Sequence, residues 1–332
     1  MRALAIARQM KSEVTLIGSR LPEGPFPAHV KTLLLPADTA PGMQVESFDA
    51  LHYAPLAVAG LRERMGLIAD WIRQAWPCVL VVDVSVEIAM LARLFGVPCV
   101  YMRQHGERND PAHLQAYASA SMLLAPYPQA MECSHAPDWV LAKTRYSGWI
   151  SRYAGRAPQS RASGSDVLII TGQGGTAFTA ESIAAIARTS PHLQFRVAGL
   201  LEGITAQMPT NLQLLGHLAD PSGEYARASI VIGSAGDNVL AEVANLGCRF
   251  IAVAEQRPFD EQRLQAQQLQ ALGVAVGVAK VPAPQQWPAL LEAARRLPGA
   301  SAWQPLLAHD ATNRAAHSIE QTLQSHFSDP AQ

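Results

Sequence analysis

The chain has 332 residues, a length that favours two domains over one. Hydrophobic residues make up 49% and charged residues 16%, so the chain can bury a large core. The formal net charge is -1 and no long basic run occurs, which argues against nucleic acid as a partner.

No uninterrupted apolar run reaches the roughly 18 residues that a membrane span requires. Arg2, Arg8 and Lys11 interrupt the apolar stretch at the N-terminus, which is unlike a signal peptide. The cysteines are scattered without metal-ligand spacing and are interpreted as free thiols in a reducing compartment; they are Cys78, Cys99, Cys133 and Cys248. We therefore expect a cytoplasmic protein, with peripheral contact at the inner face of the membrane left open.

The first 150 residues alternate between segments with helical periodicity and short apolar segments typical of buried strands. Helices are expected at 2–11, 54–76 and 87–96, and strands at 14–19, 78–85 and 97–104. A further helix and strand are expected within 113–127. Alternation of helices with fully apolar strands predicts a parallel, doubly wound sheet.

Residues 151–165 are small, polar and basic, which is typical of an interdomain linker. The α/β alternation then restarts, with strands expected near 166–170, 193–199, 212–218, 230–236 and 249–254, and helices near 179–190, 238–247 and 260–273. The sequence thus predicts two tandem Rossmann-like domains, 1–150 and 166–305. A last helix within 306–332 is expected to return to the first domain.

Ligands of parallel sheets bind where the carboxyl ends of the strands meet helix N-termini, and three loops of the second domain fit that place. The first loop follows the strand at 166–170. Its glycines allow the backbone to approach a phosphate or another domain, and the expected binding residues are Gly172, Gln173, Gly174 and Gly175. A plain tight turn explains this loop equally well.

The second loop, 233–238, opens a helix that contains Glu242. Small residues at a helix start leave amide donors free for a diphosphate, so Ser234, Gly236, Asp237 and Asn238 are candidate binding residues. The Glu242 carboxylate can accept two hydrogen bonds from ribose hydroxyls. An exposed glutamate paired with a nearby arginine is the alternative.

The third loop, 254–262, follows the next strand and offers side chains that suit sugar hydroxyls: Gln256, Glu261 and Gln262. A helix start capped by Asp260 is the alternative. Each loop alone is inconclusive, but three of them at successive strand ends of one domain are a more specific pattern.

The segment SAGDNVLAEVANLGCRFIAVAEQRPFDEQ (234–262) resembles the donor site of GT-B glycosyltransferases, and most of all the lipid II-forming N-acetylglucosaminyltransferases and related UDP-sugar transferases. The resemblance implies a donor-loop role for Ser234 and Gly236, a ribose role for Glu242 and sugar contacts from Gln256 and Gln262. It also implies that His217 and Leu218 border the nucleobase.

This sequence departs from the family at several positions. Glu261 stands where a second glutamine is usual, and Asp237 and Asn238 replace apolar residues. Relatives also open with a strand and a GxGHxxR loop, and MRALAIARQM matches only the end of that motif, with Arg2 as its arginine. The first strand of the N-terminal domain is therefore expected to be missing: either the chain is truncated, or its start is misassigned, or the role of that loop is lost.

Two residues of the first domain are catalytic candidates. Asp83 ends an apolar strand, where an unpaired carboxylate is costly, so it faces the cleft or caps the next helix. His105 follows the next strand and is a candidate general base; a hydrogen-bonded loop histidine is the alternative.

The expected reaction is transfer of a hexose or N-acetylhexosamine from a UDP-sugar to an acceptor hydroxyl on a small molecule, a glycan or a lipid-linked glycan. No cofactor is expected and, because no DxD motif occurs, no metal either. Two alternatives stay open: a nucleotide-sugar hydrolase on the same fold, and a non-catalytic subunit that binds nucleotide sugar.

Overall fold

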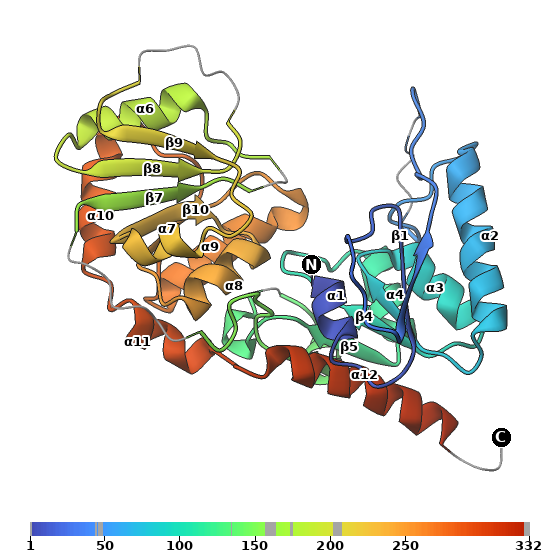
Figure 1. Ribbon diagram of the computed structural model, residues 1–332. Coiled ribbons are helices and arrows are strands. Elements are labelled where there is room, and N and C mark those ends of the chain that lie inside the picture. Colours follow the sequence, from blue (N-terminus) through green and yellow to red (C-terminus); the bar gives the residue numbers. More distant parts are fainter. Residues whose placement is uncertain are drawn as a thin grey trace.

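The computed structural model describes residues 2–43, 45, 49–133, 135–156, 164–172, 175–201 and 208–328. They form two α/β domains side by side, and a long C-terminal helix runs beneath the first domain (Figure 1). Every strand pairing is parallel. The expected architecture of two tandem α/β domains with parallel sheets is therefore confirmed.

The first domain contains a four-stranded sheet of order β3-β4-β5-β6 and a separate parallel pair, β1-β2. The strands are β1 (Val14–Gly18), β2 (Val30–Leu34), β3 (Leu80–Asp83), β4 (Cys99–Met102), β5 (Met122–Ala125) and β6 (Thr144–Tyr146). The helices are α1 (Arg2–Ala7), α2 (Ala59–Gln74), α3 (Val86–Leu94), α4 (Pro111–Ser119) and α5 (Asp138–Lys143). Strands β1 and β3 lie in different sheets and do not pair with each other.

Local sequence explains where the first-domain helices begin. Ser85 caps α3 by accepting a hydrogen bond from the Ile88 amide, and Asp110 caps α4 with Pro111 in its first turn. The helix expected over 54–76 begins only at Ala59, because Ala57 has a positive φ of 59° that a right-handed helix excludes. The helix expected over 2–11 ends at Ala7.

The second domain is one six-stranded sheet of order β12-β11-β10-β7-β8-β9. Its strands are β7 (Asp166–Ile170), β8 (Gln194–Ala198), β9 (Leu212–Gly216), β10 (Ile230–Ser234), β11 (Phe250–Val253) and β12 (Val276–Val278). Its helices are α6 (Ala180–Thr189), α7 (Ser222–Arg227), α8 (Asp237–Asn245), α9 (Glu261–Ala271), α10 (Trp287–Arg295) and α11 (Ala300–Trp303). The central strands β10 and β11 are buried along their whole length, as the apolar runs predict.

The C-terminal helix α12 (Ala311–Phe327) packs on the first domain (Figure 1). Small and branched residues on one face of it contact α1, β4 and β5; the cluster contains Ile6, Val100, Met102, Leu124, Ala315, Ala316 and Ile319. Glu320 of α12 also accepts hydrogen bonds from the backbone amides of Lys11 and Ser12, at 2.8 and 2.9 Å. The end of the chain therefore holds the turn after α1 in place.

All four cysteines are free thiols, and three of them are buried. Among the helices of the described ranges, none has both the length and the apolar character needed to cross a bilayer.

A backbone contact joins the two domains at Gly106 and Phe259. The Glu107 amide donates to the Phe259 carbonyl at 2.9 Å, and Arg108 lies over the Phe259 ring at 4.4 Å. Phe259 and Asp260 are both in the left-handed region, with φ of 61° and 55°. We name residues 105–108 and 259–261 the interdomain clasp.

Gly106→Ala is expected to open the clasp. Gly106 has a φ of +100°, and an added Cβ would lie 2.6 Å from the Phe259 carbonyl oxygen. Gly96→Ala is the matched control, since Gly96 also has a positive φ (+69°) but no atom within 4 Å of the added Cβ. Overpacking of this kind costs about 1–3 kcal/mol, so Gly106→Ala should unfold at a clearly lower temperature than Gly96→Ala. Equal melting temperatures would contradict a tight clasp.

Candidate functional site

Three loops of the second domain lie next to one another at the carboxyl ends of adjacent strands. They follow β11, β10 and β7, which are consecutive in the sheet. Sequence order alone does not reveal this adjacency, because β8 and β9 intervene between β7 and β10 along the chain. The three loops predicted as a nucleotide-sugar site therefore share one edge of the sheet.

The loop after β10 presents the start of α8. Gly236 is the N-cap residue, so the amides of the first turn, which begins with Asp237 and Asn238, have no partner within the helix. Asn238 is exposed, whereas Ser234 is buried at the end of β10. This helix start carries the partial positive charge that favours an anion.

Glu242 lies two turns into α8, buried at 8% exposure. Its carboxylate accepts a hydrogen bond from the Tyr225 hydroxyl at 2.9 Å and pairs with Arg152 Nε at 2.9 Å. Burial raises the pKa of Glu242, and the Arg152 charge opposes that rise. The alternative of an exposed glutamate is wrong, although the pairing with an arginine is present.

The loop after β11 is held from inside by two side chains. Gln262 Oε1 accepts from the Glu255 amide at 3.0 Å, and its amide nitrogen faces Gly236. Gln256 is exposed. The Asp260 side chain does not cap α9 and instead pairs with Arg263. The alternative of a helix start capped by Asp260 is therefore wrong. The backbone of Asp260 is left-handed, so its carboxylate cannot turn toward the first amides of the helix.

Glu261 points to the first domain. It pairs with Arg108 at 3.1 Å, and burial followed by the nearby Asp237 charge raises its pKa. Glu261 stands where a glutamine is usual in the family that the sequence resembles, and in this chain its carboxylate has an ion-pair partner, Arg108.

The Gly-rich loop after β7 is described only in part. Gln173 and Gly174 lie outside the described residues; Gly172 is half-buried and Gly175 is exposed with a φ of +89°. Glu255, which sequence reasoning did not select, accepts a hydrogen bond from the Ala177 amide at 3.2 Å and pairs with Arg257 at 2.8 Å. It therefore ties this loop to the loop after β11.

His217 and Leu218 follow β9, at the far side of the β7 loop. His217 is exposed, and Leu218 packs partly against the core. The Gly216 carbonyl accepts from the Gly199 amide at 2.8 Å, which fixes the backbone just before His217.

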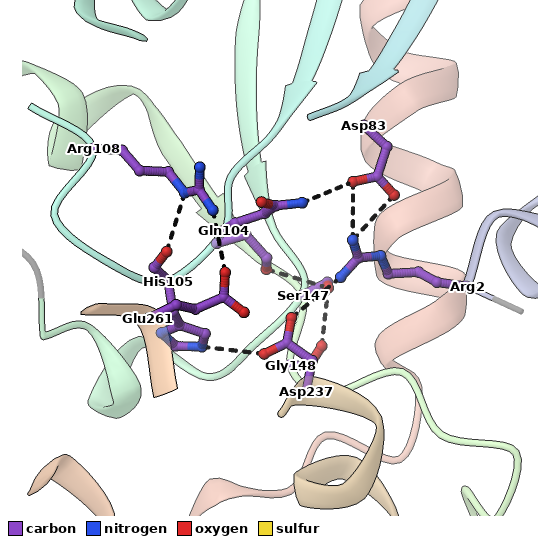
Figure 2. Close-up of polar contacts among 10 residues, drawn as sticks. Arg2, Asp83, Gln104, His105, Arg108, Ser147, Gly148, Asp237 and Glu261 are labelled. Carbon is purple, nitrogen blue, oxygen red and sulfur yellow. Dashed lines mark hydrogen bonds and ion pairs between the residues drawn. The ribbon is translucent and has the colours of Figure 1, made fainter. Parts of the chain in front are cut away.

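Charged side chains of the first domain converge on the start of α8 (Figure 2). Arg2 donates to both oxygens of Asp83, at 2.9 and 3.0 Å, and lies 3.4 Å from Asp237. Gln104 also approaches Asp83, at 3.5 Å. Of the two alternatives for Asp83, the cleft side is therefore correct, since Ser85 supplies the helix cap.

His105 is buried between the domains. Its ring stacks on Tyr127, with centroids 3.8 Å apart, and its Nε2 lies 3.8 Å from Asp237 Oδ1. Both atoms are buried without a hydrogen-bond partner in the described part of the protein. Burial lowers the pKa of His105, while Asp237 opposes that shift. A neutral imidazole next to an unpartnered carboxylate oxygen is able to accept or relay a proton.

Stability should fall on acidification partly because of His105. The pKa of His105 is lower in the folded chain than in the unfolded chain. Below about pH 6.5 the unfolded chain therefore binds a proton that the folded chain excludes. The free energy of unfolding then decreases as the pH falls, until the pH reaches the pKa of His105 in the folded chain. His105→Gln should show a smaller loss of melting temperature between neutral and mildly acid pH. His317→Gln, at an exposed position on α12, is the control. Parallel pH profiles for wild type and His105→Gln would contradict the burial argument.

A cavity of about 420 Å³ opens beside the loop after β11. Its polar lining residues are Glu255, Gln256, Arg257, Asp260, Arg263 and Lys280. Another cavity, of about 480 Å³, lies in the first domain, away from these loops. Within the described ranges, no group of three or more His, Cys, Asp or Glu side chains is arranged to hold a metal ion.

The second domain matches a known family. Residues 203–293 match the model of the glycosyltransferase family 28 C-terminal domain, which covers α8 and the loops around it. A search of curated proteins gives no match to the chain.

Solved structures share the fold over nearly the full length. MurG of Acinetobacter baumannii superposes with a TM-score of 0.63 at 16% identity, covering 96% of this chain and 95% of that one. Arabidopsis thaliana UGT89C1, solved with UDP, gives a TM-score of 0.65 at 14% identity and covers 97% of this chain and 96% of that one. A UDP-glucosyltransferase from Polygonum tinctorium gives a TM-score of 0.67 at 14% identity and covers 97% of this chain and 95% of that one. The chain therefore shares the fold of these structures, and residues 203–293 are similar to a glycosyltransferase family 28 C-terminal domain.

Proposed function

We propose that this protein transfers a hexose or N-acetylhexosamine from a UDP-sugar to an acceptor hydroxyl. The observation that carries the proposal is the meeting of the α8 N-terminus, inside the segment that matches the family 28 model, with His105 directly and with Asp83 through Arg2. The UDP preference is supported by similar structures that are named as UDP complexes or UDP-sugar enzymes.

In this proposal Glu242 binds the ribose. Tyr225 and Arg152 hold its carboxylate in one orientation, and a carboxylate has about four lone-pair sites, so hydroxyls of a ribose can still be accepted. The backbone at Gly216–Leu218 borders the base. Arg152 lies in the segment that leads from the first domain into the second. The ion pair between Arg152 and Glu242 therefore belongs both to the ribose site and to the connection between the two domains.

The diphosphate lies at the start of α8. The free amides of the first turn donate to phosphate oxygens, and the small residues Ser234 and Gly236 let them approach. Asp237 would repel the diphosphate, and Arg2 offsets that charge from 3.4 Å. The sugar then faces Gln256, Glu261 and Gln262 on the loop after β11, together with Gly172 and Gly175.

The chemical step needs a base on the acceptor side. As the acceptor oxygen bonds to the anomeric carbon, the bond from that carbon to the β-phosphate oxygen breaks, and UDP leaves with the electron pair. His105 accepts the hydroxyl proton, with Asp237 beside it to stabilise the imidazolium. Asp83, bonded to Arg2, is the second candidate for this role. The helix dipole and amides of α8 stabilise the charge that grows on the leaving diphosphate.

The full chain can be tested with UDP-glucose and UDP-N-acetylglucosamine, with and without a panel of small-molecule, glycan and lipid-linked glycan acceptors. We expect release of UDP that depends on an acceptor and an equal amount of glycosylated product. Rapid stoichiometric hydrolysis of donor alone would indicate a nucleotide-sugar hydrolase instead. Binding of UDP without turnover under any condition would indicate a non-catalytic subunit.

A further inference from the structure

The cavity of about 420 Å³ beside the loop after β11 also borders the segment that follows β12. Gln256 and Arg257 of the loop and residues 279–281 of the segment line it, and Ala177 comes from the segment between β7 and α6. We call this space the β11–β12 cavity. Small-molecule pockets measure about 300–1,000 Å³, so its size suits one sugar residue better than a long glycan.

The charged side chains around the β11–β12 cavity carry an excess of one positive charge. Three are cations and two are carboxylates: Arg257, Arg263, Lys280, Glu255 and Asp260. The remaining lining residues are Gln256 and small apolar residues. A cavity with this lining favours an anion over a neutral ligand.

Both carboxylates already have partners within the chain. Glu255 is buried at 6% exposure; its carboxylate accepts from the Ala177 amide at 3.2 Å and pairs with Arg257 at 2.8 Å. Asp260 pairs with Arg263 at 2.7 Å. Neither carboxylate therefore neutralises the third cation of the cavity.

Lys280 is that third cation. Its side chain is exposed, and in the part of the chain that the structure describes no carboxylate or carbonyl accepts from its ammonium group. The backbone just before it is fixed at the end of β12, where the Val278 carbonyl accepts from the Ala254 amide at 2.8 Å. Lys280 thus lines the cavity without an anionic partner among the described residues.

Arg263 can act as a second cationic donor. Its pair with Asp260 is exposed to solvent, with side-chain exposures of 42% and 58%. Exposed ion pairs contribute little to stability, so a ligand carboxylate can share or replace Asp260 at the guanidinium. A guanidinium binds a carboxylate through two parallel hydrogen bonds. Lys280 and Arg263 therefore offer one carboxylate two cationic partners within the same cavity.

Gln256 connects the cavity to the proposed position of the sugar. It is exposed, it lines the cavity, and it is one of the side chains assigned above to the transferred sugar. A sugar that contacts Gln256 therefore borders the cavity. A neutral hexose leaves the excess positive charge without a partner, whereas a hexose oxidised at C6 to a carboxylate supplies one.

We propose that the β11–β12 cavity is a carboxylate subsite for the transferred sugar, which makes a UDP-hexuronate the preferred donor. Lys280 and Arg263 bind the carboxylate, and Gln256 forms a hydrogen bond with a hydroxyl of the same ring. This inference rests on the proposed transfer from a UDP-sugar and adds the class of sugar to it.

Isothermal titration of the full chain with UDP, UDP-glucose and UDP-glucuronate, at constant ionic strength, tests the proposal. The two UDP-sugars differ only at C6, and UDP alone reports on the nucleotide site. We expect UDP-glucuronate to bind about tenfold or more tightly than UDP-glucose, the lower range for a hydrogen bond to a charged group. Lys280→Met and Arg263→Gln should each reduce that ratio, and Lys280→Arg should keep most of it. Arg295→Gln, which removes an ion pair of this domain outside the cavity, is the control and should leave the ratio unchanged.

The outcomes separate this inference from the proposed function. Binding of UDP with equal affinities for the two UDP-sugars would overturn the carboxylate subsite and leave the nucleotide site intact. A preference for UDP-glucuronate that survives both Lys280→Met and Arg263→Gln would place the carboxylate elsewhere and overturn the subsite as well. Equal donor affinities combined with a Lys280-dependent preference for carboxylated or phosphorylated acceptors would assign the anion to the acceptor, with the same result. No binding of UDP or of either UDP-sugar would overturn the proposed function and this inference together.

Discussion

Replacing His105 by glutamine is expected to lower kcat for sugar transfer by about 100- to 10,000-fold, the usual contribution of a positioned general base. His105 is buried beside the α8 N-terminus with its Nε2 unpartnered in the described protein, and Asp237 lies 3.8 Å away. Because the imidazole acts on the acceptor and not on the nucleotide, the affinity for UDP should stay close to wild type. Initial rates at saturating donor and titration with UDP measure the two quantities separately.

Asp83→Asn is the comparison that decides between the two base candidates. Asp83 is half-exposed and already bonded by Arg2, so its loss should reduce the rate less than the loss of His105. His317→Gln, on the outer face of α12, should leave the rate unchanged. A full rate for His105→Gln, or a larger loss in Asp83→Asn, would contradict the assignment of His105 as base.

Glu242→Ala is expected to weaken UDP binding by about 10- to 150-fold, since a hydrogen bond to a charged group contributes about 1.5–3 kcal/mol and 1.4 kcal/mol is a tenfold change. A 2′,3′-dideoxy analogue of UDP lacks the hydroxyls that Glu242 binds, so its affinity should change far less. Isothermal titration of the full chain with both ligands measures the difference.

Tyr225→Phe is the matched control for Glu242. It removes the internal hydrogen bond at 2.9 Å and leaves the carboxylate, so UDP affinity should fall only slightly. If Glu242→Ala weakens UDP and the dideoxy analogue equally, Glu242 does not hold the ribose and serves only the ion pair with Arg152.

Much of the second domain was predictable from sequence because its signals are local. Apolar runs such as 230–234 and 250–253 predict buried strands, and a glycine before an amphipathic segment predicts the start of α8. The positions of the three loops at strand ends followed from chain order and the rule for parallel sheets. Strand β12 and helix α10 were not predicted.

The contacts between the domains were beyond sequence reasoning because they join residues far apart in the chain. Arg2 meets Asp237, and Arg108 meets Glu261, across separations that no periodicity encodes. The burial of His105 against Tyr127 likewise depends on how the domains close. The tandem α/β patterns in the sequence predict that two domains exist. The surfaces through which the two domains contact each other depend instead on the shape and charge of particular side chains.

The location of the nucleotide site is tested most directly by hydrogen exchange of the full chain with and without millimolar UDP. The account predicts slower exchange in the first turns of α8, around Asp237–Glu242, and in the loop after β11, Glu255–Gln262, with the outer strands of the first domain unchanged. No change at these two segments at saturating UDP, or protection confined to the first domain, would contradict it.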